Sequence, residues 1–254
     1  MIRQTIHPRQ VRPFRITTMP PYPFLRRCML LLLVLLPAGA AAQNFSGVSS
    51  PTVRPGERGF QLRSSFLPAD DGADARYGFR VHYQEALTDT LRARGSVAVA
   101  DRGAGSLDVD AVKLELQKQL SANFGMRLDG SLGGSGRNDA AALNFYAQLP
   151  ATDALTLRGV VQVAREFGDT RRDGLQFQTR GAAVYRLSDS LTLSGEAFAR
   201  HGKLGSGGAD DSIQAGPRLA AVLGDGWTVE PQWLWGATGP VPDNELRLWI
   251  GRRF

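Results

Sequence analysis

The sequence contains few of the residues on which covalent or metal chemistry depends. Its 254 residues include one cysteine and three histidines. Cys28 lies in a segment that we predict to be removed after export, so the mature chain has no cysteine. That absence excludes a disulfide framework and a thiolate metal site. With His82 and His201 as the remaining imidazoles, neither a metal site nor a cofactor is expected.

The sequence also lacks an apolar run long enough to cross a membrane as a helix. The run CMLLLLVLL at 28–36 has nine residues, whereas a transmembrane helix needs about 20. Two arginines precede this run, and an Ala-rich stretch ending at Ala42 follows it. This is the pattern of a secretory signal peptide. We therefore predict that residues 1–42 are a leader that is removed after export, with Met19 as an alternative start.

Without this leader the chain has no excess of either charge. The whole sequence has 30 basic and 24 acidic residues. Residues 1–42 hold six arginines and no acidic residue, so the mature chain has 24 of each. Nucleic acid is therefore not an expected partner, and any function of charge must come from its position along the chain.

Alternation of apolar and polar residues runs through the mature chain. It is clearest at 174–202, where two alternating runs flank the short turn LSDSL at 187–191. A period of two indicates β-strands, and Ser-Asp-Ser indicates a tight turn in which the Asp side chain is expected to bond the backbone. The segment is therefore predicted to be a β-hairpin, and similar units recur along the chain.

This recurrence predicts twelve antiparallel strands and no helix. Most of them have 10–14 residues, which suits strands that cross a membrane at a tilt. Merging or splitting a hairpin gives ten or fourteen strands as alternatives. The predicted strands are 58–67, 76–87, 90–100, 106–120, 123–132, 140–149, 154–166, 174–187, 190–201, 212–223, 226–237 and 244–254.

One predicted strand, 106–120, changes phase along its length. Leu107 and Val109 are apolar at odd positions, whereas Val112 and Leu114 are apolar at even positions. A β-bulge near Asp110 would reset the alternation, because it adds one residue to one of the two paired strands.

The apolar face of the strands is expected to contact lipid. Aromatic residues gather near the strand ends, as in the interfacial belts of membrane barrels. The opposite face carries many arginines, which lipid would not accept. A soluble barrel or sandwich, with its apolar face inside, is the alternative. We predict an all-β fold, a closed antiparallel transmembrane β-barrel over 58–254.

The segment before the first strand has a different composition. Residues 43–57 are rich in Ser, Pro and Gly and show no periodicity. Short turns alternate with longer, acidic loops along the chain, and an even number of strands puts both chain ends on the short-turn side, which is periplasmic in outer-membrane barrels. We therefore predict that 43–57 is a periplasmic N-terminal tail or a short plug.

Basic residues dominate the polar face, which lines the lumen of the predicted barrel. Guanidinium groups stay charged and bind carboxylates and phosphates, and rings of arginine select anions in pores. We predict a passive channel for small anionic solutes. The predicted pore-lining residues are Arg63, Arg80, Arg127, Arg158, Arg180, Arg218 and Arg247.

The same residues permit a structural interpretation. Glu196 is expected diagonal to Arg180, and Lys113, Glu115, Arg127 and Asp129 are expected in one ladder. Such salt bridges could brace a closed lumen. The alternative function is therefore a non-transporting barrel that serves structure, adhesion or partner binding.

No catalytic residue is predicted. His82 is expected to face the lumen near Ser96, but Glu85 lies on the opposite face and cannot orient it. His201 has no serine in register beside it. Trp249 and Phe198 are expected to face inward, where they would fill the lumen or offer a stacking surface.

The last predicted strand carries a family resemblance. The sequence ELRLWIGRRF places Leu248, Ile250 and Phe254 on one face. It resembles the terminal assembly signal of Gram-negative outer-membrane proteins, except that Arg252 replaces a more usual apolar residue. The resemblance implies periplasmic chaperones and the barrel-assembly machinery as partners. It also implies contact with lipids and lipopolysaccharide in the cell outer membrane.

A second resemblance concerns the barrel as a whole. Its mature size, strand count and Arg-rich inner face are similar to those of the twelve-stranded oligogalacturonate-specific porin family. That similarity implies acidic saccharides as solutes.

Overall fold

The fold is known from a computed structural model. It describes residues 45–69, 74–101, 106–134, 136–205, 212–238 and 241–254. The predicted leader at 1–42 lies outside the described residues, as do parts of five of the longer connections between strands.

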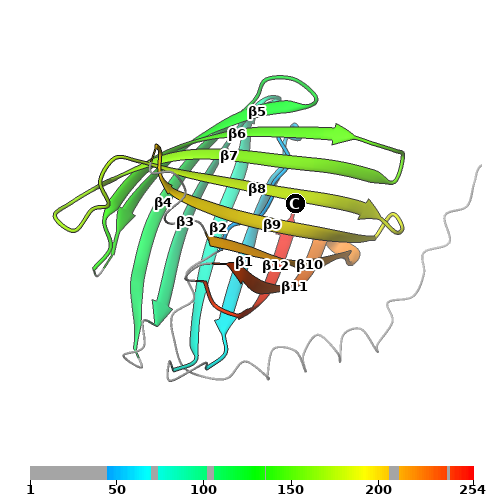
Figure 1. Ribbon diagram of the computed structural model, residues 1–254. Helices are drawn as coiled ribbons and strands as arrows, with labels where there is room; N and C mark the ends of the chain where they lie inside the picture. Colours follow the sequence, from blue (N-terminus) through cyan, green and yellow to red (C-terminus); the bar gives the residue numbers. More distant parts are fainter. Residues whose placement is uncertain (1–44, 70–73, 102–105, 135, 206–211, 239–240) are drawn as a thin grey trace, which may run out of the picture. The chain divides into compact units, whose positions relative to one another are not determined.

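Twelve antiparallel strands close into a barrel (Figure 1). Each strand pairs with its neighbours in sequence, and β12 pairs with β1 to complete the ring. The predicted fold class and the count of twelve strands are confirmed. The strands are β1 (Arg58–Leu67), β2 (Arg76–Thr88), β3 (Leu91–Asp101), β4 (Leu107–Gln119), β5 (Phe124–Gly133), β6 (Asp139–Pro150), β7 (Leu155–Phe167), β8 (Leu175–Arg186), β9 (Leu191–Lys203), β10 (Ser212–Val222), β11 (Trp227–Thr238) and β12 (Asn244–Arg253).

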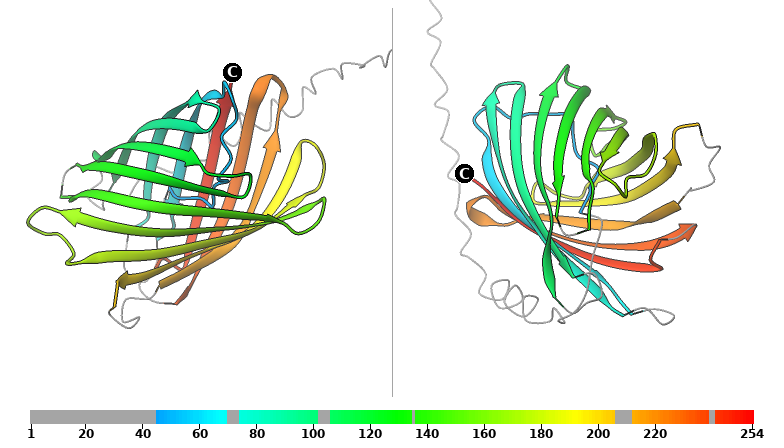
Figure 2. Two further views of the ribbon diagram at one scale, coloured as in Figure 1. Left: turned by 90° about the horizontal axis from the view of Figure 1, so that it is seen from above. Right: turned by 90° about the vertical axis from the view of Figure 1, so that its left-hand side faces the viewer.

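The strands that form the barrel wall are tilted relative to the barrel axis, as Figure 2 shows. The turns after β2, β4, β6, β8 and β10 are short and lie at one rim with the start of β1 and the end of β12. We name this the short-turn rim, and the opposite one the long-loop rim. A single 3₁₀ turn, η1 (Gly224–Gly226), joins β10 to β11. Among the described residues, no helix is long and apolar enough to cross a membrane.

Hydroxyl side chains and backbone bonds close the short turns. In LSDSL the N–H of Leu187 donates to the carbonyl of Leu191 at 2.9 Å. The sequence predicted that an Asp side chain accepts the backbone hydrogen bond in these turns. The acceptor is instead the hydroxyl of the first turn residue, because that position faces the backbone N–H groups two and three residues later. These hydroxyls belong to Thr88, Ser121, Thr152 and Ser188.

The phase change in β4 is a β-bulge. Ala98 of β3 pairs with Ala111, and the next residue, Val99, pairs with Val109, so Asp110 has no partner in the ladder. Asp110 is buried and its carboxylate accepts from Arg137 at 2.7 Å. The bulge that the sequence predicted near Asp110 is therefore confirmed.

Adjacent residues on a strand show which face is which. Ser96 is 8% exposed and Val97 is 46% exposed, while on β4 Glu115 is 4% exposed and Leu114 is 59% exposed. Polar side chains thus point into the barrel and apolar ones point out, the arrangement of a membrane barrel. The outer aromatics include an edge-to-face pair, Phe60 and Trp227, with ring centroids 5.7 Å apart.

Candidate functional site

The segment before β1 lies inside the barrel and contacts its wall. The carbonyl oxygen of Phe45 accepts a hydrogen bond from Arg63 on β1, at 2.6 Å, and another from Arg80 on β2. The carbonyl of Ser46 accepts one from Arg247 on β12 at 3.0 Å. Two neutral backbone carbonyls of this segment therefore accept hydrogen bonds from three lumen arginines.

Further contacts of the segment reach other strands around the barrel. The amide of Gln117 on β4 donates to the carbonyls of Ser50 and Pro51, at 3.2 and 3.0 Å. The side chain of Val48 is 1% exposed. It packs in an apolar cluster with Tyr146, Val160, Ala182, Phe198 and Leu234, from five different strands. Residues 45–53 thus span the lumen from one wall to the other.

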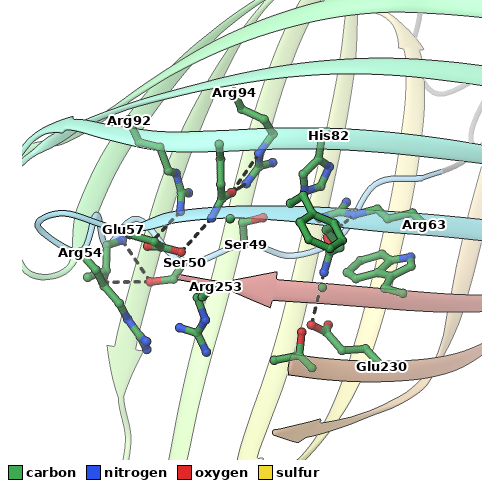
Figure 3. Close-up of a pocket in the computed structure, with 18 of the residues that line it drawn as sticks. Ser49, Ser50, Arg54, Glu57, Arg63, His82, Arg92, Arg94, Glu230 and Arg253 are labelled. Carbon is green, nitrogen blue, oxygen red and sulfur yellow. Dashed lines mark hydrogen bonds and ion pairs between the residues drawn. The ribbon is translucent and has the colours of Figure 1, made fainter. Parts of the chain in front are cut away.

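Two polar cavities lie along the lumen on either side of this segment. One, of about 410 Å³, opens toward the short-turn rim, and Ser49 and Ser50 of the segment line it (Figure 3). The other, of about 220 Å³, lies toward the long-loop rim and is lined by Ser46 and Gly47. Since Arg63, Arg94 and Ser49 line both, the segment separates two parts of one lumen.

Both cavities are strongly basic. Among its described lining residues the larger cavity has eight arginines and two acidic residues, Glu57 and Glu230. The smaller has eight arginines, one lysine and one acidic residue, Glu115. Fixed positive charge at a low-dielectric wall raises the local concentration of anions. The lumen can therefore attract and hold anionic groups.

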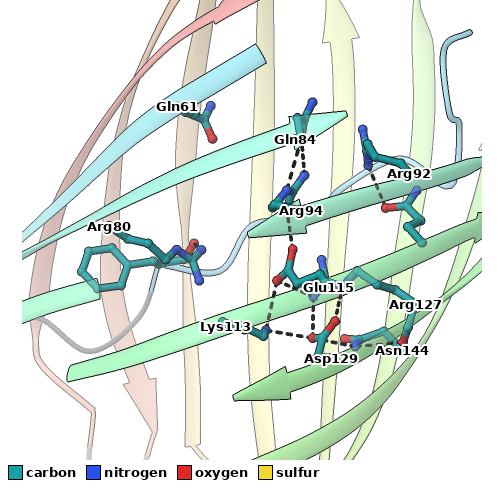
Figure 4. A network of polar contacts seen from close by, with 12 residues as sticks. Gln61, Arg80, Gln84, Arg92, Arg94, Lys113, Glu115, Arg127, Asp129 and Asn144 are labelled. Atoms are coloured by element: carbon teal, nitrogen blue, oxygen red, sulfur yellow. Dashed lines mark hydrogen bonds and ion pairs between the residues drawn. The ribbon is translucent and has the colours of Figure 1, made fainter. Parts of the chain in front are cut away.

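Part of this charge is neutralised by a network between β4 and β5 (Figure 4). Glu115 contacts Arg94 at 3.0 Å, Lys113 at 3.1 Å and Arg127 at 3.5 Å. Asp129 contacts Lys113 at 2.8 Å and Arg127 at 2.6 Å. The side-chain amide of Asn144 donates to Asp129 at 3.0 Å. The ladder expected from the sequence therefore forms one connected network.

A second group of ion pairs lies across β9 to β12. Arg218 contacts Glu196 at 2.8 Å and Glu230 at 3.3 Å, and Arg247 contacts Glu245 at 2.8 Å. The sequence placed Glu196 diagonal to Arg180. Arg218 on β10 is diagonal to Glu196 as well and makes the ion pair, while Arg180 donates to Gln162 instead.

The other predicted pore-lining arginines lack such partners. Within the part of the chain that the structure describes, several arginines that line the cavities make no ion pair with a carboxylate, among them Arg63, Arg80, Arg158, Arg180 and Arg200. The buried Nε atoms of Arg80 and Arg158 have no hydrogen-bond partner in the described ranges. Arg158 lines the larger cavity, whereas Arg80 and Arg180 line the smaller one, and Arg63 lines both. Arg200 was not among the predicted pore-lining residues.

Aromatic rings contact several of these guanidinium groups. Arg63 lies over the ring of Trp249 at 3.9 Å, and Arg80 lies 5.4 Å from the ring of Phe45. Arg247 lies 5.2 Å from the ring of Phe198. The inward placement of Trp249 and Phe198 follows the sequence alternation. Phe45 was missed because its segment has no periodicity, although an isolated aromatic in a polar stretch was a usable signal.

The histidines occupy unrelated environments. His82 is 3% exposed and pairs across the sheet with Ser96, as expected. Glu85 lies on the other face, in an ion pair with Arg58 at 3.0 Å. His201 contacts the hydroxyl of Thr179 at 2.9 Å.

The chain end continues the pairing of β12 with β1. The N–H of Phe254 donates to the carbonyl of Arg58 at 3.1 Å, and the side chain of Phe254 is exposed. Ile250 and Leu248 pair with Leu62 and Ser64 of β1. These three predicted assembly residues therefore lie at the seam where the barrel closes.

Comparison with known proteins shows similarity in fold. No family model and no curated protein matches the sequence. An outer membrane channel from Pseudomonas putida F1 is 12% identical, with a TM-score of 0.63, over 83% of this chain and 100% of that one. The KdgM porin in complex with disordered oligogalacturonate is 13% identical, with a TM-score of 0.58, over 77% and 99%. The NanC porin is 13% identical, with a TM-score of 0.54, over 77% and 98%. The fold is that of an outer-membrane porin barrel.

Proposed function

We propose that this chain is a passive outer-membrane channel for small anionic solutes. The observation that carries the proposal is the charge of the smaller cavity, which has nine basic residues and one acidic residue in its described lining. Five of the nine are ion-paired, and the other four, Arg63, Arg80, Arg180 and Arg200, make no ion pair with a carboxylate among the described residues. Anions are concentrated by such a field and cations are repelled. Unpaired guanidinium groups also bind carboxylates through two parallel hydrogen bonds.

Acidic saccharides are the solute class that fits best. A sugar acid presents a carboxylate to an arginine and an apolar ring face to an aromatic side chain. Arg63 and Trp249 place both kinds of side chain at one position on the wall, with the guanidinium lying over the ring. One porin of similar fold was found with oligogalacturonate, which is a saccharide of this kind.

Recordings from the wild-type protein in planar bilayers test this function. In a potassium chloride gradient, with galacturonate at equal concentration on both sides, we expect the reversal potential to show preference for chloride. Proteoliposomes should also admit galacturonate faster than galactose, because the two sugars differ mainly in charge. Absence of conductance, or equal entry of both sugars, would contradict an anion channel.

A non-transporting barrel is the second candidate. The observation in its favour is that residues 45–53 cross the lumen and contact both walls. The ion network between β4 and β5 would then brace a closed interior that serves adhesion or partner binding. This candidate predicts no conductance in any salt gradient, for the wild type and for lumen variants alike.

The location and assembly follow from the barrel and its last strand. We propose that the leader at 1–42 directs export and that periplasmic chaperones deliver the chain to the barrel-assembly machinery. The outer face then contacts lipid and lipopolysaccharide. We propose Phe254, Ile250 and Leu248 as the assembly signal.

Removal of Phe254 tests this assembly signal. We expect the truncated chain to stay out of the membrane and to be degraded, because Phe254 ends the strand that closes the barrel. The measurement is the heat-modifiable, membrane-inserted fraction on gels. Leu246→Ala, on the same outer face nearer the long-loop rim, is the control and should insert normally. Normal insertion of the truncated chain would argue against a terminal signal.

A further inference from the structure

We propose that Arg63 and Arg80 form a carboxylate-binding site that the chain's own segment 45–53 fills, and that an anionic solute displaces this segment to open the lumen. The inference rests on the proposed channel function and deepens it. It assigns both the site at which the solute binds and the segment that closes the lumen.

The two arginines are arranged for an anion. Arg63 and Arg80 lie directly opposite each other on β1 and β2, a placement in which like charges repel. Among the described residues neither makes an ion pair with a carboxylate. Both donate instead to one neutral carbonyl oxygen, that of Phe45. A carboxylate would supply two oxygens and a full negative charge at the same place.

The site also holds unused hydrogen-bonding capacity. The Nε of Arg80 is buried and has no hydrogen-bond partner among the residues that the structure describes. A buried donor without an acceptor is unfavourable, and charged donors more so. A bound carboxylate could accept from this atom, which the single carbonyl of Phe45 does not do in the structure. The segment therefore satisfies the site incompletely.

The segment is suited to be displaced. Residues 45–53, FSGVSSPTV, carry no charge, so they compete with an anion through dipoles alone. They are held by hydrogen bonds of their backbone and of two hydroxyl side chains to the wall, and by three buried apolar side chains, Phe45, Val48 and Val53. They belong to no strand of the sheet. Their release therefore leaves the barrel pairing intact.

Displacement would join the two cavities into one passage. The segment lies between cavities of about 410 and 220 Å³, and Arg63 lines both. The proposed site is therefore at the constriction itself. A solute that binds there replaces the contacts that hold the segment, so that binding and opening are coupled through competition.

The absence of cysteine from the mature chain allows a direct test. Val48→Cys in a Cys28→Ser background gives one thiol that is buried while the segment is seated. We expect a water-soluble maleimide to label it about tenfold faster in saturating galacturonate than in galactose at equal ionic strength, because the solute favours the displaced state. Ser188→Cys, in an exposed turn, is the control and should be labelled at the same rate in galacturonate and in galactose.

The arginines can be tested in the same assay. With Arg63→Gln and Arg80→Gln added, basal labelling at position 48 should rise and the response to galacturonate should disappear. Equal labelling in galacturonate and galactose, in a protein that conducts anions selectively, would overturn this inference and leave the channel in place. A galacturonate response in a protein that does not conduct would support the site and remove the channel.

A second variant unseats the segment without changing either arginine. A Cβ atom at Gly47 would collide with the ring of Trp249. We therefore expect Gly47→Val to raise the open probability in bilayer recordings by about tenfold without solute. Gly95→Val, on the outer face where a Cβ meets open space, is the control. An unchanged open probability in Gly47→Val would overturn the proposal.

Discussion

The walls formed by β4 and β5 and by β1 and β2 carry their charges in opposite ways. On β4 and β5, Glu115 and Asp129 face each other and each binds flanking cations. On β1 and β2, Arg63 and Arg80 face each other, and both donate to one backbone carbonyl. The first wall satisfies its own charges, whereas the second depends on a group from outside the sheet.

This difference separates two roles that a lumen arginine can have. Where a carboxylate is within reach, removing either partner leaves a buried charge uncompensated. Where none is within reach, the arginine adds to the field in the lumen and little to the stability of the fold. In the proposed channel, the same residue type would therefore serve structure on one wall and solute attraction on the other.

The largest effect is expected at Glu115. Glu115→Gln removes the carboxylate that Arg94, Lys113 and Arg127 share, which leaves buried positive charge uncompensated. It should lower the free energy of unfolding by about 3–5 kcal/mol. Urea unfolding in lipid vesicles measures it. Glu85→Gln is the matched control, because Glu85 is in a half-exposed pair with Arg58 and should cost at most about 1 kcal/mol. Equal losses in both would remove the distinction between the walls.

A smaller contrast is expected between two arginines. Arg127→Gln leaves Glu115 and Asp129 undercompensated, and its unfolding free energy should fall by roughly 3 kcal/mol. Arg80→Gln removes repulsion from Arg63, so its unfolding free energy should stay within about 1 kcal/mol of the wild type. Both variants replace a lumen arginine with glutamine. If Arg80→Gln lowers the unfolding free energy as much as Arg127→Gln does, Arg80 is a structural residue.

The sequence predicted the strands because period-two alternation is a local property. The bulge at Asp110 was visible for the same reason, as a change of phase within β4. The ion pair of Glu196 was not predictable, because Arg180 and Arg218 are both diagonal to it and side-chain reach decides between them. The sequence left the position of 45–53 open between a periplasmic tail and a short plug, since a segment without periodicity can lie inside or outside a barrel.

The central distinction between the walls is tested by one pair of charge changes measured in two ways. Arg158→Gln with Arg180→Gln removes two unpaired charges, whereas Lys113→Gln with Asp129→Asn removes one of each sign from the braced wall. We predict that the first pair lowers anion preference in the reversal potential and leaves the unfolding free energy nearly unchanged. The second pair should lower the unfolding free energy and leave the reversal potential where it was. If both pairs shift the reversal potential equally, or if the first pair leaves it untouched, unpaired lumen arginines do not set the selectivity.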